Sequence, residues 1–179
     1  MKKSPRLAVT AATVLGIALG VAALAHGEDK RASPHDKTSA TVGGKRITIE
    51  YGRPYKKGRD IFGALVPWGK VWRTGADEAT TFTCDGDVTI GDLKVPKGSY
   101  ALFTVPGEKQ WQLVVNKSPK QWGAFKYDAK DDLGTTALKV AAAPTPVEQL
   151  TIALEPAADK RVTLKISWDK TVASTTIAP

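Results

Sequence analysis

The apolar residues of this chain recur with a period of two in several segments, and this pattern limits the choice of fold. Segments 46–51 (RITIEY), 111–115 (WQLVV), 150–155 (LTIALE) and 161–168 (RVTLKISW) place an apolar side chain at every second position. This alternation is typical of β-strands with one buried face and one solvated face. Segment 100–105 (YALFTV) is apolar at both sets of positions, which predicts a central strand covered on both faces. No long window shows the 3.6-residue period of a helix.

Turn signals separate these runs at short, regular intervals. They include Gly-Gly at 43–44, Gly-Asp at 91–92, Pro-Lys-Gly at 96–98 and Pro-Gly at 106–107. About nine short strands at this spacing indicate an all-β fold. We expect one antiparallel β-sandwich over 38–170, jelly-roll-like or Ig-like. Segments 60–69 and 118–125 leave room for a helical turn, and the Thr-rich end, 171–179, is expected to fray.

The N-terminus reads as an export signal. Lys2, Lys3 and Arg6 precede an uncharged stretch, and Ala23-Leu24-Ala25 has the small-x-small pattern of a cleavage site. We therefore expect a signal peptide over 1–25, cleaved after Ala25, and a periplasmic or secreted protein. A polar stretch, 26–37, would form a flexible leader. Contact with a membrane is expected only through the N-terminal segment, if that segment is not cleaved.

Charge and residue usage exclude several function classes. Three of the 26 Lys and Arg residues lie in the first six positions, so a net charge of +8 falls to +5 beyond them. That surplus is spread out, and we expect no nucleic-acid partner. The two histidines, His26 and His35, both fall in the predicted leader. The folded domain is therefore expected to lack a histidine base, a nucleophile–histidine pair and an imidazole metal site; no cofactor is expected. Cys84, the single cysteine, is interpreted as a buried apolar residue.

The candidate site lies in 71–82, VWRTGADEATTF, and at the strand end EYGRP. One interpretation is a polar pocket for an anionic or sugar-like ligand, lined by the residues Arg53, Trp68, Trp72, Arg73 and Glu78. The other is structural: Arg73 pairs with Asp77 or Glu78 and holds a long loop on the sandwich. Gly75 would permit a positive φ in that loop. No catalytic residue is assigned.

The five tryptophans divide into two groups. Trp111 and Trp168 fall on the predicted dry faces and are expected in the core. Trp68, Trp72 and Trp122 flank predicted loops, where they either stack on sugar rings or pin the loops over the end of the core.

Several motifs together resemble a bacterial family of unknown function, DUF2911. The resemblance covers about residues 38–168 and rests on Gly52-Arg53-Pro54, Trp72-Arg73-Thr74-Gly75, Glu78-Ala79-Thr80 and Gln121-Trp122-Gly123-Ala124. It implies an exported, β-rich bacterial protein and transfers no catalytic residue. Many members have Asn at the position of Asp77, which leaves Glu78 as the better carboxylate.

Two hypotheses follow from the sequence. The first is a non-enzymatic binding or envelope-associated module whose ligand is a small molecule or a glycan. The alternative is a histidine-free, carboxylate-based glycan hydrolase with Glu78 as the acid. Because Asp77 and Glu78 would point to opposite faces of a strand, such chemistry would need a distant second carboxylate.

Overall fold

A computed structural model of the chain describes residues 31–179, so the predicted signal peptide and the beginning of the leader lie outside the described residues. Within this range the structure is all-β and antiparallel, which confirms the predicted fold class. A short 3₁₀ turn, η1 (Ala129–Asp131), is present, and no helix of the described residues is long and apolar enough to cross a membrane. The described strands are β1 (His35–Val42), β2 (Lys45–Gly52), β3 (Thr80–Cys84), β4 (Val88–Ile90), β5 (Leu93–Val95), β6 (Gly98–Val105), β7 (Trp111–Asn116), β8 (Asp132–Pro156) and β9 (Val162–Ala178).

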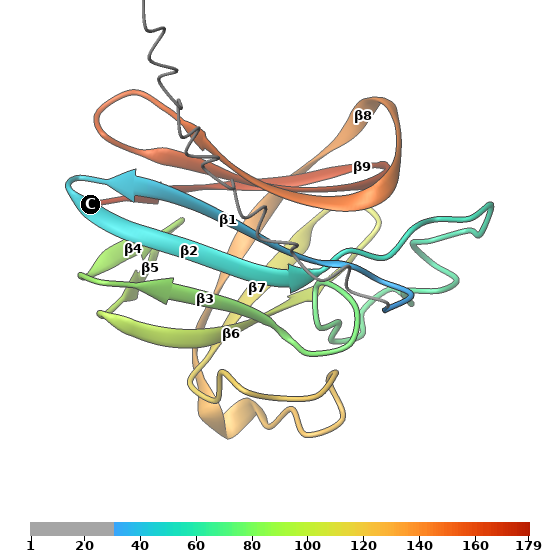
Figure 1. The fold of residues 1–179 in the computed structure, drawn as a ribbon, viewed down its shortest axis with the longest axis horizontal. Helices are drawn as coiled ribbons and strands as arrows, with labels where there is room; N and C mark the ends of the chain where they lie inside the picture. Colours follow the sequence, from blue (N-terminus) through green and yellow to red (C-terminus); the bar gives the residue numbers. More distant parts are fainter. Residues whose placement is uncertain (1–30) are drawn as a thin grey trace, which may run out of the picture.

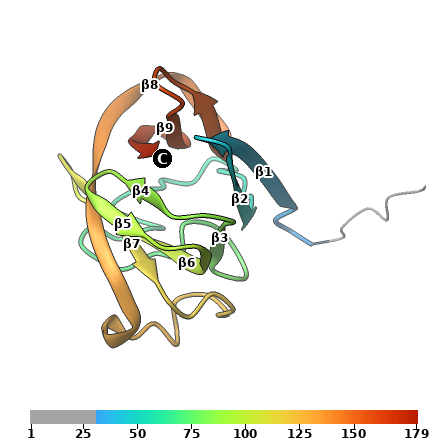
Figure 2. The same cartoon turned by 90° about the vertical axis from the view of Figure 1, so that its left-hand side faces the viewer.

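These strands form one sheet that folds over on itself into two layers (Figure 1). The strand order is β1-β2-β3-β6-β7-β8-β9-β4-β5. The first part of β8 pairs with β7, and the rest of β8 pairs with β9. Figure 2 shows β8 running along one side of the molecule, from one layer to the other. A single long strand thus joins the two faces of the sandwich.

The core lies between the two layers and is rich in aromatic side chains. Trp111 and Trp168 are 1% and 2% exposed, which confirms their predicted place in the core. Phe62 packs edge-on against Trp111, with ring centroids 4.7 Å apart. Cys84 is also buried and its thiol donates to the Pro96 carbonyl, as expected for a structural cysteine. Burying one large apolar side chain stabilises a fold by about 1.5–3 kcal/mol, so this cluster dominates stability.

Strand β6 is covered on both faces, as predicted. Tyr100 and Leu102 face the main core, whereas Ala101 and Phe103 belong to a second, smaller cluster. The Phe103 ring contacts Tyr127 at a centroid distance of 5.1 Å. Segment 117–131 therefore folds back over the outer face of the sheet, and this places Trp122 beside the candidate site.

Four local expectations were wrong. Strand β9 continues to Ala178, so the end expected to fray pairs with β8 and β4. Strand β1 starts at His35, inside the range expected to be a flexible leader. Thr145-Pro146 was expected to bound a strand, but β8 continues through Pro144 and Pro146 with a register shift between Ala142 and Val147. Segments 60–69 and 118–125 contain turns and isolated bridges but no helix.

Candidate functional site

The spacing of the site residues comes from two backbones in contact, at the end of β2 and in the loop before β3. Ala76 donates its backbone N–H to the Gly52 carbonyl at 3.2 Å. A Cβ on Gly52 would lie 2.3 Å from the Ala76 carbonyl oxygen, and one on Gly75 would lie 3.0 Å from the Gly52 oxygen. Both glycines are required because no side chain fits between the chains. The segments EYGRP and RTGADE are therefore one structural unit.

A third segment holds this unit from the other side. The Ala79 N–H donates to the Gln121 carbonyl and the Gly123 N–H donates to the Asp77 carbonyl, both at 2.9 Å. These bonds place Glu78 opposite Trp122. The side chain of Gln121 is itself fixed, because its amide nitrogen donates to the Ser118 carbonyl at 2.8 Å. The sequence motifs that identify the resemblance thus meet at one place.

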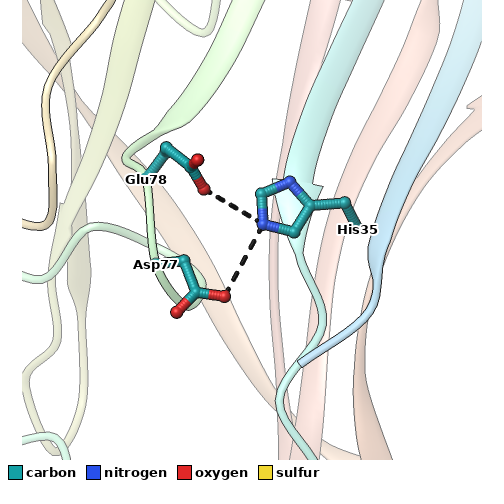
Figure 3. A group of neighbouring side chains, drawn as sticks. All are labelled: His35, Asp77 and Glu78. Carbon is teal, nitrogen blue, oxygen red and sulfur yellow. Dashed lines mark ion pairs between the residues drawn. The ribbon is translucent and has the colours of Figure 1, made fainter. Parts of the chain in front are cut away.

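Two carboxylates and an imidazole converge in this unit (Figure 3). His35 Nε2 lies 3.1 Å from Glu78 Oε2 and 3.7 Å from Asp77 Oδ2. His35 reaches them because it begins β1, opposite Gly52 in the β1–β2 register. The three side chains are only partly buried, with 31% of His35 and Asp77 and 44% of Glu78 exposed.

A left-handed backbone at Asp77 explains why adjacent carboxylates point to the same place. Its φ is 62°, and Thr74 has a φ of 58°, whereas Gly75, where a positive φ was expected, is not in that region. On a strand, Asp77 and Glu78 would face opposite sides. The left-handed residue breaks this alternation, so both side chains turn toward His35. Such a conformation is costly for a non-glycine residue, and the hydrogen bond from Gly123 helps to hold it.

An open groove of about 550 Å³ adjoins the cluster. Its floor is the solvated face of β2, β3 and β6. On this face the hydroxyls of Thr83 and Ser99 form a hydrogen bond of 3.1 Å. Its wall is the segment 119–122. The groove is lined by His35, Glu50, Tyr51, Gly52, Glu78, Ala79, Thr81, Thr83, Ser99, Pro119, Lys120, Gln121 and Trp122.

Of the predicted site residues, Glu78 lines this groove and the other four do not. Arg53 links β1 to β8: its guanidinium donates to Asp36 at 2.9 Å, to the Leu150 carbonyl at 3.0 Å and to the Thr151 hydroxyl at 3.0 Å. This is a structural role, because the side chain is already engaged by the fold.

The two predicted tryptophans pack inside or over the core. Trp72 is 8% exposed and stacks on Trp168 with ring centroids 5.9 Å apart. Trp68 is 37% exposed and stacks on Phe62 at 6.1 Å. Both contacts match the loop-pinning interpretation. Trp122, which the sequence left open between the two roles, is 60% exposed beside the groove.

The expected ion pair between Arg73 and a neighbouring carboxylate is not formed among the described residues. Glu78 instead contacts His35 and Arg31, and Asp77 contacts His35. The Arg73 Nε atom is buried and has no hydrogen-bond partner in the described structure. The loop is held by backbone bonds and by the contacts of Glu78 with Arg31 and His35, not by an ion pair of Arg73.

The expectation that the folded domain lacks a histidine base and an imidazole metal site rested on a wrong premise. It placed His35 in a flexible leader, but His35 belongs to the sheet and contacts both carboxylates. The alternative of a hydrolase with Glu78 as the acid stays a hypothesis, but its site is not histidine-free. Both Glu78 oxygens accept hydrogen bonds from Arg31, at 3.3 and 3.1 Å.

The fold and the site define an all-β, antiparallel protein with a polar groove on the solvated face of β2, β3 and β6. Comparison with protein families assigns it further: the family described as "Protein of unknown function (DUF2911)" matches residues 33–177. The chain belongs to this family, which confirms the resemblance over a slightly longer range than expected. No curated protein and no solved structure matches the chain.

Proposed function

We propose that this protein is an exported, non-enzymatic binding module that takes a sugar-like ligand in the groove beside Glu78. Export is inferred from the N-terminal sequence, residues 1–25. The observation that carries the ligand proposal is Trp122, a large aromatic side chain that is 60% exposed on the wall of a polar groove. An exposed tryptophan beside hydrogen-bonding groups is a suitable platform for a sugar ring, which has both an apolar face and hydroxyls.

The groove floor offers hydrogen bonds to hydroxyl groups. Thr81, Thr83 and Ser99 present side-chain hydroxyls on adjacent strands β3 and β6. Hydroxyls both donate and accept, so they can match sugar hydroxyls in either orientation. A surface of this kind fixes the orientation of a polar ligand while Trp122 covers its apolar face.

The charges in the groove favour a neutral ligand over an anionic one. The acidic side chains that line it are Glu50 and Glu78, and the basic one is Lys120. The arginines that suggested an anionic ligand, Arg53 and Arg73, do not line it. No arginine is among the described residues that line the groove, and Arg31, which contacts Glu78, donates to that carboxylate. The lining therefore lacks the bidentate donors that usually recognise carboxylates or phosphates.

The proposal is tested by titrating the protein with soluble oligosaccharides (maltohexaose, cellohexaose and chitohexaose) in an isothermal titration calorimeter. At least one should bind. Trp122→Ala should weaken its binding about tenfold or more, because the stacking contact is lost; a tenfold change corresponds to about 1.4 kcal/mol of binding free energy.

Phe125→Ala is the matched control. Phe125 is 86% exposed in the same segment but does not line the groove, so its removal should leave binding unchanged. The proposal fails if none of the oligosaccharides binds, or if the two alanine variants weaken binding equally.

A further inference from the structure

We propose that His35, Asp77 and Glu78 form a binding site for a divalent transition-metal cation, with Zn²⁺ as the best match. The three side chains come from the start of β1 and from the loop before β3, and their ligand atoms all lie within 4.8 Å of one another. This site goes beyond the proposed sugar-like ligand, because it needs neither Trp122 nor the hydroxyls of the groove floor.

The separations between the ligand atoms suit one shared cation. Zinc binds imidazole nitrogen and carboxylate oxygen at about 2.0–2.2 Å in a tetrahedron, so neighbouring ligand atoms around it lie about 3.3–3.6 Å apart. His35 Nε2 lies 3.1 Å from Glu78 Oε2 and 3.7 Å from Asp77 Oδ2, which is slightly below and slightly above this range. Small rotations of the partly exposed side chains would bring both separations into range.

A cationic nitrogen of the chain already sits among these atoms. Arg31 Nη1 lies 2.8 Å from His35 Nε2 and 3.1 and 3.3 Å from the two oxygens of Glu78. Arginine can only donate, so in this contact Nε2 presents its lone pair. A ring nitrogen of His35 and the Glu78 carboxylate thus both face one positive centre, which is the arrangement a metal ion requires. Arg31 marks the cation position, and a metal would displace it.

The donor set and its exposure define the class of metal. One imidazole nitrogen with two carboxylates suits Zn²⁺ and its first-row neighbours, whereas Mg²⁺ and Ca²⁺ prefer oxygen alone. With 31–44% of each side chain exposed, water can complete the coordination shell. The backbone bond from Gly123 to Asp77 and the tight contact at Gly52 hold the carboxylates in place before any metal arrives.

The test is calorimetric titration of the purified protein, without a polyhistidine tag, with ZnCl₂. We expect one Zn²⁺ per chain, and we expect His35→Gln and Glu78→Gln each to weaken binding about tenfold or more. Arg31→Ala should instead tighten binding, because it removes the competing guanidinium. Metal-free melting temperatures of the variants establish that each one is folded.

Two controls make the outcome decisive. His26→Gln removes the other histidine of the chain and should leave Zn²⁺ binding unchanged. Trp122→Ala should bind Zn²⁺ normally even though it loses the oligosaccharide, which separates this site from the proposed ligand groove. The inference is overturned if wild type takes up no stoichiometric Zn²⁺, if folded His35→Gln binds as tightly as wild type, or if Mg²⁺ binds as tightly as Zn²⁺.

Discussion

Replacement of Gly52 by alanine tests whether the contact between the end of β2 and the following loop builds the whole site. The new methyl carbon would lie 2.3 Å from the carbonyl oxygen of Ala76 and 3.0 Å from its carbonyl carbon. Both atoms are backbone, so no side-chain rotation can relieve the overlap. An ordinary contact of this kind is about 1 Å longer, so the loop that carries Asp77 and Glu78 must move away from β2.

The cost follows from three terms. Overpacking of a buried position typically costs about 1–3 kcal/mol. Loss of the Ala76–Gly52 hydrogen bond adds about 1 kcal/mol. The reduced freedom of the unfolded chain returns about 0.4–1 kcal/mol. We therefore expect Gly52→Ala to lower the free energy of unfolding by about 1–3 kcal/mol, the estimate for overpacking with the two smaller terms nearly cancelling.

Urea denaturation followed by tryptophan fluorescence measures this loss, and a ZnCl₂ titration of the folded variant reports on the loop. Gly86→Ala is the control, since its methyl would meet only the flexible side chain of Lys45, at 2.9 Å from Cγ. That variant should stay within about 0.5 kcal/mol of wild type. If Gly52→Ala is as stable as Gly86→Ala and still binds Zn²⁺, the contact does not position the loop and our reasoning is refuted.

Two further predictions concern titratable groups with raised pKa values. Burial raises the pKa of the Cys84 thiol, so its reaction with a disulfide reagent at mildly alkaline pH should be slow in the folded protein and rapid in concentrated urea; equal rates would show that the thiol is accessible. Burial, together with the hydrogen bond to Asp132, raises the pKa of Tyr127 to about 12, above its ordinary value of 10.0. The folded state thus holds this proton more tightly than the unfolded state, and the resulting stability is complete below pH 10 and is lost as pH rises toward 12. Urea titrations across this window should show a smaller loss for Tyr127→Phe than for wild type, and identical losses would contradict this assignment.

Strands β2 and β7 and the apolar halves of β8 and β9 could be predicted from the sequence because each carries its own alternation. The same patterns placed Trp111 and Trp168 in the core, and the apolar run of β6 predicted a strand covered on both faces. The length of β8 and β9 could not be predicted, because their Thr- and Ala-rich halves have few large apolar residues. Those halves are ordered by pairing with each other: Lys139 lies opposite Ser174, a partner 35 positions away. Local sequence carries no signal of that distance.

The site was predicted in part. The segments that build it were recognised, and Glu78 lies in the groove, but His35 was assigned to a leader because its neighbours are polar. A signal for it did exist in the hairpin turn at Gly43-Gly44. Counting residues outward from that turn places His35 opposite Gly52, which belongs to the EYGRP motif of the predicted site. The left-handed backbone of Asp77 could not be read from sequence, because it arises from contacts with segments far along the chain.

The passage of β8 through both layers governs when this chain can fold. The Tyr51 hydroxyl accepts from the Ile152 N–H at 2.9 Å, across a separation of 101 residues. Until residues from the last third of the chain arrive, the inner face of the first five paired strands has nothing to pack against. Loops of this length close slowly, and proteins with such distant pairings fold in milliseconds to seconds. Chains that stop short of β9 should therefore remain open and prone to aggregate.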